Sequence, residues 1–185
     1  MFWRVPRYVF ALSGLLLSCS TLHAYDNIQL KLTLTAPSTS QTFSPTGVVV
    51  DRTGKIWVTD PPSNSIVVFS SAGEFVQQIG HAGTGLGEFS GPHGIATDLE
   101  GTIYIADTGN NRVQVLSPDG KPRLAFGERG DGSGQMRNPE GLAVSQDGVV
   151  VIADSGNEIH AICVDPGVVL NHTFRRQYPA GDWRE

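Results

Sequence analysis

The sequence contains few cysteines, and this scarcity excludes a fold that depends on disulfides. Only Cys19 and Cys163 occur among the 185 residues, whereas a disulfide-stapled domain needs several cysteine pairs. Cys19 lies in an N-terminal segment that we expect to be removed, which leaves Cys163 without a partner in the same chain. Because Cys163 lies within an apolar run, we interpret it as a small core side chain rather than a redox or catalytic group.

Basic residues are also scarce. The chain has 13 Lys and Arg residues against 18 Asp and Glu residues, and it contains no long basic run. Binding to the phosphates of DNA or RNA requires clustered Lys and Arg side chains. We therefore expect no nucleic-acid partner.

Apolar runs long enough to span a membrane are missing as well. The run Tyr8–Leu17 is short; Arg4 and Arg7 precede it, and a small-residue cleavage site follows at Leu22–Ala24. This arrangement predicts a secretory signal peptide over residues 1–24. The mature protein would then be exported, secreted or periplasmic, with no transmembrane span. Its formal net charge would change from -5 to -7, because the removed segment contains two basic and no acidic residues.

The same segment leaves a second interpretation open. Residues 16–19, with the sequence Leu-Leu-Ser-Cys, resemble a bacterial lipobox. In that case Cys19 would carry a lipid and anchor the mature protein to a membrane surface.

Helical periodicity is absent after the signal segment, but a repeat is present. Residues 27–36 alternate apolar and polar side chains, which predicts a half-buried strand. Three residue types then recur every 47 residues: Pro45, Pro92 and Pro139; Gly47, Gly94 and Gly141; Asp60, Asp107 and Asp154. A fixed period of this size is typical of a repeat architecture.

The period divides the chain into six parts. We expect a signal peptide (1–24), an N-terminal strand and incoming loop (25–44), three repeats (45–91, 92–138 and 139–174) and a C-terminal tail (175–185). Each repeat contains four short apolar runs separated by glycine turns, which suit antiparallel strands. In the central repeat these strands are expected at 94–98, 102–106, 112–116 and 121–126. Four-stranded antiparallel units at this period are typical of β-propeller blades, so the predicted class is all-β.

The central repeat also resembles a known family. Its run from Pro92 to Leu116 follows the NHL pattern of Pro-x-Gly-apolar-Ala-x-Asp and then Gly-x-apolar-Tyr-apolar-Ala-Asp-Thr-x-Asn-x-Arg. The third repeat has Glu158 where this pattern has arginine, and the first has Ser65. The chain therefore resembles the NHL-repeat β-propeller family. The resemblance implies four-stranded blades, about three of them here, and leaves activity open because these propellers serve as binding, sensor and enzyme domains.

The repeat predicts where a ligand would bind. Equivalent positions form a ring around a propeller axis, so residues 47 apart become neighbours. The loops that enter the first strands and the loops between the second and third strands are expected at one end of the blades. Candidate residues for a ligand or partner are the residues between Pro and Gly, which are Thr46, His93 and Glu140, and the loop residues Asn64, Asn110, Asn111, Arg112 and Asn157.

Asp60, Asp107 and Asp154 occur in every repeat, and we assign them a structural role. A short carboxylate at such a position commonly orders the loop that follows it through backbone hydrogen bonds. No histidine or cysteine pair has metal-ligand spacing on one element. The sequence therefore predicts no catalytic residue and no metal ligand.

Two classes of function remain open at this stage. The first is an exported NHL-type binding module for a protein, peptide or glycan partner. The alternative is a part of a metal-dependent propeller enzyme that resembles the peptide-amidating lyases or the lactone hydrolases. In that case Glu140, His93 and Asn157 would supply part of a Ca²⁺ or Zn²⁺ site, and no other cofactor is expected.

Three repeats are too few to close a propeller, which needs about four to eight blades. We interpret the chain as a fragment of a six-bladed protein, the usual size for this resemblance. A homodimer of two half-propellers and an open stack of blades are the alternatives. An open stack would leave strand edges and apolar faces in water.

Overall fold

The computed structural model describes residues 34, 43–157, 159–165 and 168–170 of the chain. Contacts divide the chain into residues 1–31 and residues 32–185, and every described residue belongs to the second unit. The predicted signal peptide, Cys19, nearly all of segment 25–44 and the tail 175–185 therefore lie outside the described residues. In the described part of the chain, no helix has the length and apolar character needed to cross a membrane.

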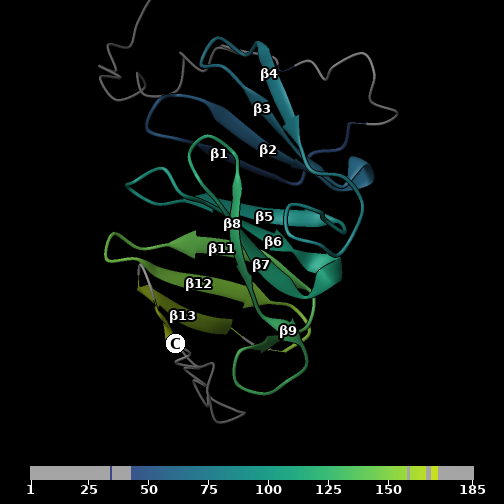
Figure 1. The fold of residues 1–185 in the computed structure, drawn as a ribbon, viewed down its shortest axis with the longest axis vertical. Helices are drawn as coiled ribbons and strands as arrows, with labels where there is room; N and C mark the ends of the chain where they lie inside the picture. Colours follow the sequence, from purple (N-terminus) through teal and green to yellow (C-terminus); the bar gives the residue numbers. More distant parts are fainter. Residues whose placement is uncertain (1–33, 35–42, 158, 166–167, 171–185) are drawn as a thin grey trace, which may run out of the picture. The chain divides into compact units, whose positions relative to one another are not determined.

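The described residues form three four-stranded antiparallel sheets, which we call blades 1, 2 and 3 (Figure 1). Blade 1 consists of β1 (Gly47–Val50), β2 (Ile56–Asp60), β3 (Ser65–Phe69) and β4 (Phe75–Ile79). Blade 2 consists of β5 (Pro92–Thr97), β6 (Ile103–Asp107), β7 (Arg112–Leu116) and β8 (Pro122–Phe126). Blade 3 consists of β11 (Pro139–Val144), β12 (Val149–Asp154), β13 (Ile159–Asp165) and β14 (Val168–Leu170). The all-β class and the partial propeller are thereby confirmed.

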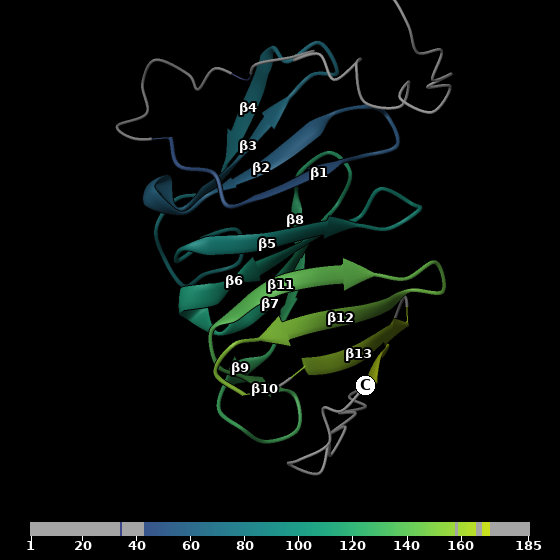
Figure 2. The same ribbon diagram turned by 180° about the vertical axis from the view of Figure 1, so that it is seen from behind.

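The first strands of the blades are neighbours, and we call β1, β5 and β11 the inner strands (Figure 2). Pro92 pairs with Asp107 and Pro139 with Asp154, so the start of each inner strand lies beside the end of the second strand. The expected common end of the blades is therefore present, and we call it the Pro-x-Gly end. The opposite end, where the first strand turns into the second, we call the turn end.

Turns shape both ends of each blade. At the turn end Gly101 has a φ of 86°, a left-handed conformation that glycine adopts without strain. At the Pro-x-Gly end short 3-10 turns replace simple loops: η1 (Pro61–Ser63) and η2 (Thr108–Asn110). Asn64 and Asn111 end these turns with φ angles of 51° and 55°, a region that asparagine tolerates better than most residues.

The cores lie between neighbouring blades. We call the face of a blade toward the preceding repeat its leading face, and the face toward the following repeat its trailing face. The core between blades 1 and 2 contains Trp57, Ile66 and Val68 from a trailing face, Ile95, Ile103, Ile105 and Leu116 from a leading face, and Phe89 from the connection. The core between blades 2 and 3 contains Tyr104, Val113, Val115, Met136, Val150 and Ile152. Each large apolar side chain buried in this way contributes about 1.5–3 kcal/mol.

The connections between blades contain short paired segments. In the second connection β9 (Glu128–Arg129) pairs in parallel with β10 (Gln135–Met136), and in the first Ala82 bridges Phe89. Phe89 and Met136 are fully buried. Because these side chains are fixed in the interblade cores, the returning half of each connection can pair with the outgoing half.

Candidate functional site

The Pro-x-Gly end brings neighbouring blades into backbone contact. A Cβ atom at Gly47 would collide with the carbonyl oxygen of His93, and one at Gly94 would collide with the carbonyl oxygen of Glu140. The Thr59 hydroxyl donates a hydrogen bond to the same His93 oxygen at 2.6 Å. The glycine of each Pro-x-Gly motif is therefore required by the approach of the next blade, and the residue before it lies at the junction between inner strands.

The three residues between Pro and Gly differ in how their side chains are used. The Thr46 hydroxyl is 3.2 Å from that of Thr59, so it belongs to the framework. The His93 imidazole is partly exposed and the Glu140 carboxylate is exposed. Within the described part of the chain neither of these two side chains makes a hydrogen bond or an ion pair. The structure thus brings His93 and Glu140 to the starts of adjacent inner strands with their polar groups available.

The three repeat aspartates clamp the chain as it enters each blade. Their Oδ1 atoms accept backbone hydrogen bonds from Ser44 (2.9 Å), Ser90 (2.8 Å) and Arg137 (2.8 Å), respectively. Asp60 and Asp107 accept no capping hydrogen bond from the backbone of the 3-10 turn that follows, but their Oδ2 atoms accept hydrogen bonds from the side chains of Ser63 and Asn110 in that turn. Each buried carboxylate therefore binds both the loop that follows it and the connection that precedes its blade.

The asparagines of the same loops are also occupied by the framework. Asn110 and Asn157 donate through Nδ2 to the carbonyl oxygens of Gly83 and Gly130, both at 2.9 Å. Asn64 and Asn111 accept through Oδ1 from the backbone N–H of Gly91 (2.8 Å) and Asn138 (3.1 Å). Each of these bonds joins a loop to the connection 27 residues away, so each asparagine holds a connection through one atom of its amide group.

Arg112 is the most heavily bonded of the candidate residues. Its Nε donates to Asp107 Oδ2 at 2.8 Å, and its side chain is 15% exposed. Its guanidinium also donates to the backbone oxygens of Thr84, Gly85 and Glu88. Arg112 therefore links the first connection to blade 2. Its planar guanidinium has five N–H donors and can bind several acceptors at once.

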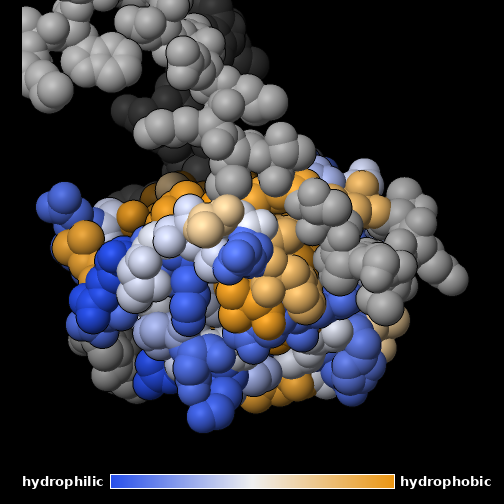
Figure 3. All heavy atoms as spheres, turned by 90° about the horizontal axis from the view of Figure 1, so that it is seen from above, coloured by the Kyte–Doolittle hydropathy of each residue, from blue (hydrophilic) through white to orange (hydrophobic). Residues whose placement is uncertain are grey.

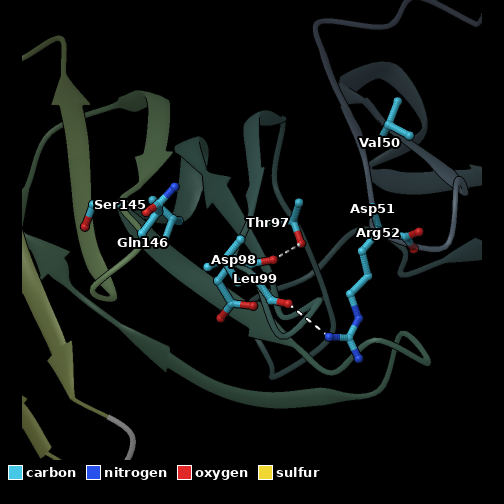
Figure 4. Close-up of a pocket in the computed structure, with 9 residues that line it drawn as sticks. Val50, Asp51, Arg52, Thr97, Asp98, Leu99, Ser145 and Gln146 are labelled. Atoms are coloured by element: carbon cyan, nitrogen blue, oxygen red, sulfur yellow. Dashed lines mark hydrogen bonds between the residues drawn. The ribbon is translucent and has the colours of Figure 1, made fainter.

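The turn end holds a hollow that sequence reasoning missed. It has a volume of about 300 Å³ and is lined by equivalent residues of the three blades: Val50, Asp51, Arg52, Thr97, Asp98, Leu99, Val144, Ser145 and Gln146. Arg52 reaches across it and donates through Nη1 to the Leu99 carbonyl oxygen at 3.1 Å (Figure 4). The 47-residue period was the signal that could have found this ring, because it places residues 52, 99 and 146 together.

The carboxylates of this hollow are used to fix turns. Asp51 accepts from Trp57 Nε1 at 2.8 Å and from Thr53, and Asp98 accepts from the Tyr104 hydroxyl at 3.2 Å. Burial alone would raise the pKa of Asp51, but the hydrogen bonds from Thr53 and Trp57 outweigh it and hold that pKa below its usual value. Burial, reinforced by the nearby negative charge of Asp98, raises the pKa of Tyr104 to about 12.

Metal ligands do not gather at either end of the described blades. Across the described residues no three His, Cys, Asp or Glu side chains lie close enough to hold an ion. Glu140 and His93 alone would supply two ligands. Of the third member of the set, Asn157, the amide is already bonded to Gly130 and Asp154.

Comparisons with protein families match the blades. A model of 6-bladed β-propellers matches residues 39–122, and a model of the NHL repeat matches residues 136–164. None of the curated proteins matches the sequence.

Solved structures with similar folds have diverse functions. A virginiamycin B lyase from Staphylococcus aureus, solved with quinupristin, is 18% identical with a TM-score of 0.57, over 75% of this chain and 44% of that chain. A gluconolactonase from Xanthomonas campestris is 22% identical with a TM-score of 0.55, over 77% and 50%. A chain of a nidogen/laminin complex is 20% identical with a TM-score of 0.55, over 71% and 48%. The described fold thus matches about half the length of each of these propellers, and at these identities the likeness concerns the fold.

Proposed function

Because the chain belongs to the NHL-repeat β-propeller family, we propose that it is an exported binding module that holds a protein, peptide or glycan partner at the Pro-x-Gly end of its blades. The main support for this proposal is that the polar side chains at that end fall into two groups, one bonded within the protein and one unbonded. The asparagines, the repeat aspartates and Arg112 hold the framework, whereas His93 and Glu140 lie on adjacent inner strands with unbonded side chains.

The chemistry of these two side chains indicates the kind of group that they recognise. An imidazole donates and accepts hydrogen bonds, and a carboxylate accepts them or binds a cation. Their backbones are fixed, because the His93 oxygen is bonded to Thr59 and both carbonyl groups lie against glycines of the neighbouring strand. A polar ligand would therefore meet two side chains on rigid strands, which lowers the entropic cost of binding. Amides, amines and sugar hydroxyls fit such a pair.

The test is a screen of peptide libraries and glycan arrays with the purified chain. The paired substitution His93→Ala and Glu140→Gln should abolish binding of the ligands found and leave the free energy of unfolding unchanged. The matched control pairs Glu74→Gln with Glu100→Gln, two exposed positions at the turn end of the blades, and it should retain binding. Retention of binding by the first pair would show that the ligand binds elsewhere.

Export is part of the proposal and has its own test. Residues 1–24 have the composition of a secretory signal peptide, and Cys19 carries the lipobox alternative. Fractionation of the host cells with mass spectrometry of the mature N-terminus should find the protein outside the cytoplasm and starting at Tyr25. A start at a lipid-modified Cys19 would replace the free exported form by an anchored one, and an intact Met1 in the cytoplasm would overturn export.

The enzymatic alternative rests on the same two residues. His93 and Glu140 would be the contribution of these blades to an axial Ca²⁺ or Zn²⁺ site, with further ligands supplied from outside the described residues. A metal that binds only the folded chain raises its unfolding temperature. An increase on addition of Ca²⁺ or Zn²⁺ that disappears in the His93→Ala and Glu140→Gln pair would favour this alternative over the binding module.

A further inference from the structure

The leading face of blade 1 has the apolar pattern of a face that belongs in an interblade core. The equivalent leading-face positions of blades 1, 2 and 3 are Val48, Ile95 and Leu142 on the first strand, Ile56, Ile103 and Val150 on the second, and Val58, Ile105 and Ile152 further along the second. In blades 2 and 3 these positions pack against the preceding blade. Blade 1 has the same apolar residues on this face, and no described blade precedes it. Val58, Val67 and Phe69 are nevertheless buried, with Leu34 and Phe43 packed against them.

Exposure shows which part of this face is uncovered. Ile95 is 8% exposed because blade 1 covers it, whereas its equivalent Val48 is 64% exposed. Val50, further along the same strand, is also exposed. In Figure 3, which looks onto blade 1, hydrophobic side chains gather on this face. Apolar side chains that cluster on a surface commonly mark a site of association.

Part of a third interblade core is already assembled on this face. In each connection one apolar residue precedes the residue whose N–H binds the repeat aspartate. These residues are Phe89 and Met136 in the two complete cores, and Phe43 before blade 1. The ring of Phe43 packs edge-on against Phe69, with centroids 6.3 Å apart. The connecting residue and the leading half of the core are thus present, and what is missing is the trailing half that Trp57 or Tyr104 supplies elsewhere.

The trailing face of blade 3 is uncovered in a corresponding way. Ala96 and Ala106 on the trailing face of blade 2 are 8% and 0% exposed. Their equivalents in blade 3, Ala143 and Ala153, are both exposed. Blade 3 therefore ends the described series with an apolar trailing face.

We propose that the leading face of blade 1 binds the trailing face of blade 3 of a second copy of this chain, and that the reverse contact closes a six-bladed ring. The two uncovered faces are the two complementary halves of one kind of interface. Two sets of three blades make the six blades of the family whose model the chain matches. A two-fold axis along the propeller axis would make both junctions identical, as in most closed homodimers, and no blade face would remain in water.

Light scattering on the purified full chain tests the ring. We expect twice the mass of one chain at moderate concentration. Val48→Asp on the leading face and Ala153→Asp on the trailing face should each reduce the mass to that of one chain, because either change places a charge in both junctions. Leu99→Asp is the matched control, since Leu99 is as exposed as Val48, at 65%, but lies at the turn end; it should leave the dimer intact.

Mixing the two interface variants gives a second readout that does not depend on either variant alone. Each retains one intact face, so an equimolar mixture should regain dimers through one unmodified junction. A native chain that stays monomeric up to its solubility limit would overturn the proposal. So would a dimer that survives Val48→Asp, or one that Val48→Asp disrupts and Ala153→Asp does not, because the contact would then join two leading faces.

Discussion

Blades 1 and 2 are built from equivalent residues, and yet the same position is core in one and surface in the other. Ile95 is buried in blade 2, and its counterpart Val48 is exposed in blade 1. The side chains are chemically similar, so the difference comes from the neighbouring blade. Whether a leading-face residue is buried therefore depends on whether another blade packs against that face. This is expected for an architecture in which each repeat contacts only its neighbours.

The two blades also differ in how they hold the connection that enters them. Asp107 of blade 2 binds Arg112 and Gln114, and these side chains reach the connection over residues 84–88. Blade 1 has Ser65 in the place of Arg112, and its hydroxyl stays within the blade, bonded to Ser63 and Gln78. Blade 2 is thus tied to the preceding segment by a polar network, and the described residues of blade 1 form no equivalent network.

The largest effect expected is at the centre of that network. The Asp107 carboxylate accepts four hydrogen bonds, from the Ser90 backbone and the side chains of Asn110, Arg112 and Gln114. Asp107→Ala leaves a largely buried guanidinium without its counter-charge and should lower the free energy of unfolding by about 4 kcal/mol. Asp60→Ala in blade 1 removes two partners, Ser44 and Ser63, and should cost about 1–2 kcal/mol. Urea denaturation measures both, and equal losses would show that the network adds nothing.

Truncation to alanine at the equivalent positions Ile95 and Val48 should destabilise the two blades to different extents. Ile95→Ala creates a cavity in the core between blades 1 and 2 and should cost about 3 kcal/mol. Val48→Ala, at a protein concentration where the chain is monomeric, should cost less than about 0.5 kcal/mol because the side chain is already in water. A comparable loss from Val48→Ala in the monomer would mean that another part of the chain covers this face.

Exchanging the loop residue of blade 2 for that of blade 1 should have an intermediate effect. Arg112→Ser removes the ion pair with Asp107 and the bonds to three backbone oxygens, and should cost about 2 kcal/mol. Hydrogen exchange should show faster opening of residues 84–88 without a change in the strands of blade 1. If hydrogen exchange of residues 84–88 is the same in Arg112→Ser as in the native chain, the guanidinium does not hold the first connection in solution.

The smallest effect is expected at Tyr104, and it depends on pH. The pKa of its phenol is raised from 10 in the unfolded chain to about 12 in the folded one. This contribution to stability is fully present below pH 10 and is lost as the pH rises through 12. Tyr104→Phe should cost about 1 kcal/mol at neutral pH, through the hydrogen bond to Asp98, and should flatten the alkaline decline in urea midpoint. An unchanged alkaline profile would contradict the assignment.

The sequence predicted the class, the period and the common end of the blades, because these depend on local patterns. Alternating apolar runs, glycine turns and the spacing of Pro92 and Asp107 each carry information within one repeat. The aspartates were expected to order the following loop, and Asp107 does bind the side chain of Asn110 there, but it also binds the backbone of Ser90, which lies 17 residues earlier. Such a contact depends on how a connection folds back, and local patterns do not specify it.

Site residues were harder to sort from the sequence. Asn110, Arg112 and His93 are all polar residues at the same end of a blade, and spacing alone does not distinguish a bonded side chain from a free one. Arg112 was a candidate for ligand contact because it lies in a loop at this end, but its described partners are Asp107 and backbone oxygens of the first connection. The hollow at the turn end was missed because the search for a ligand site considered only the loops at the Pro-x-Gly end.

The most direct test of the central claim, that the leading face of blade 1 is one half of an interblade core, is the thiol reactivity of Val48→Cys compared with Ile95→Cys. Mass spectrometry of labelled peptides separates the introduced thiols from Cys19 and Cys163. We predict that the thiol at position 95 is protected at every protein concentration, and that the thiol at position 48 reacts rapidly in dilute solution and becomes protected as the concentration rises. Rapid labelling at position 48 at all concentrations would contradict the account.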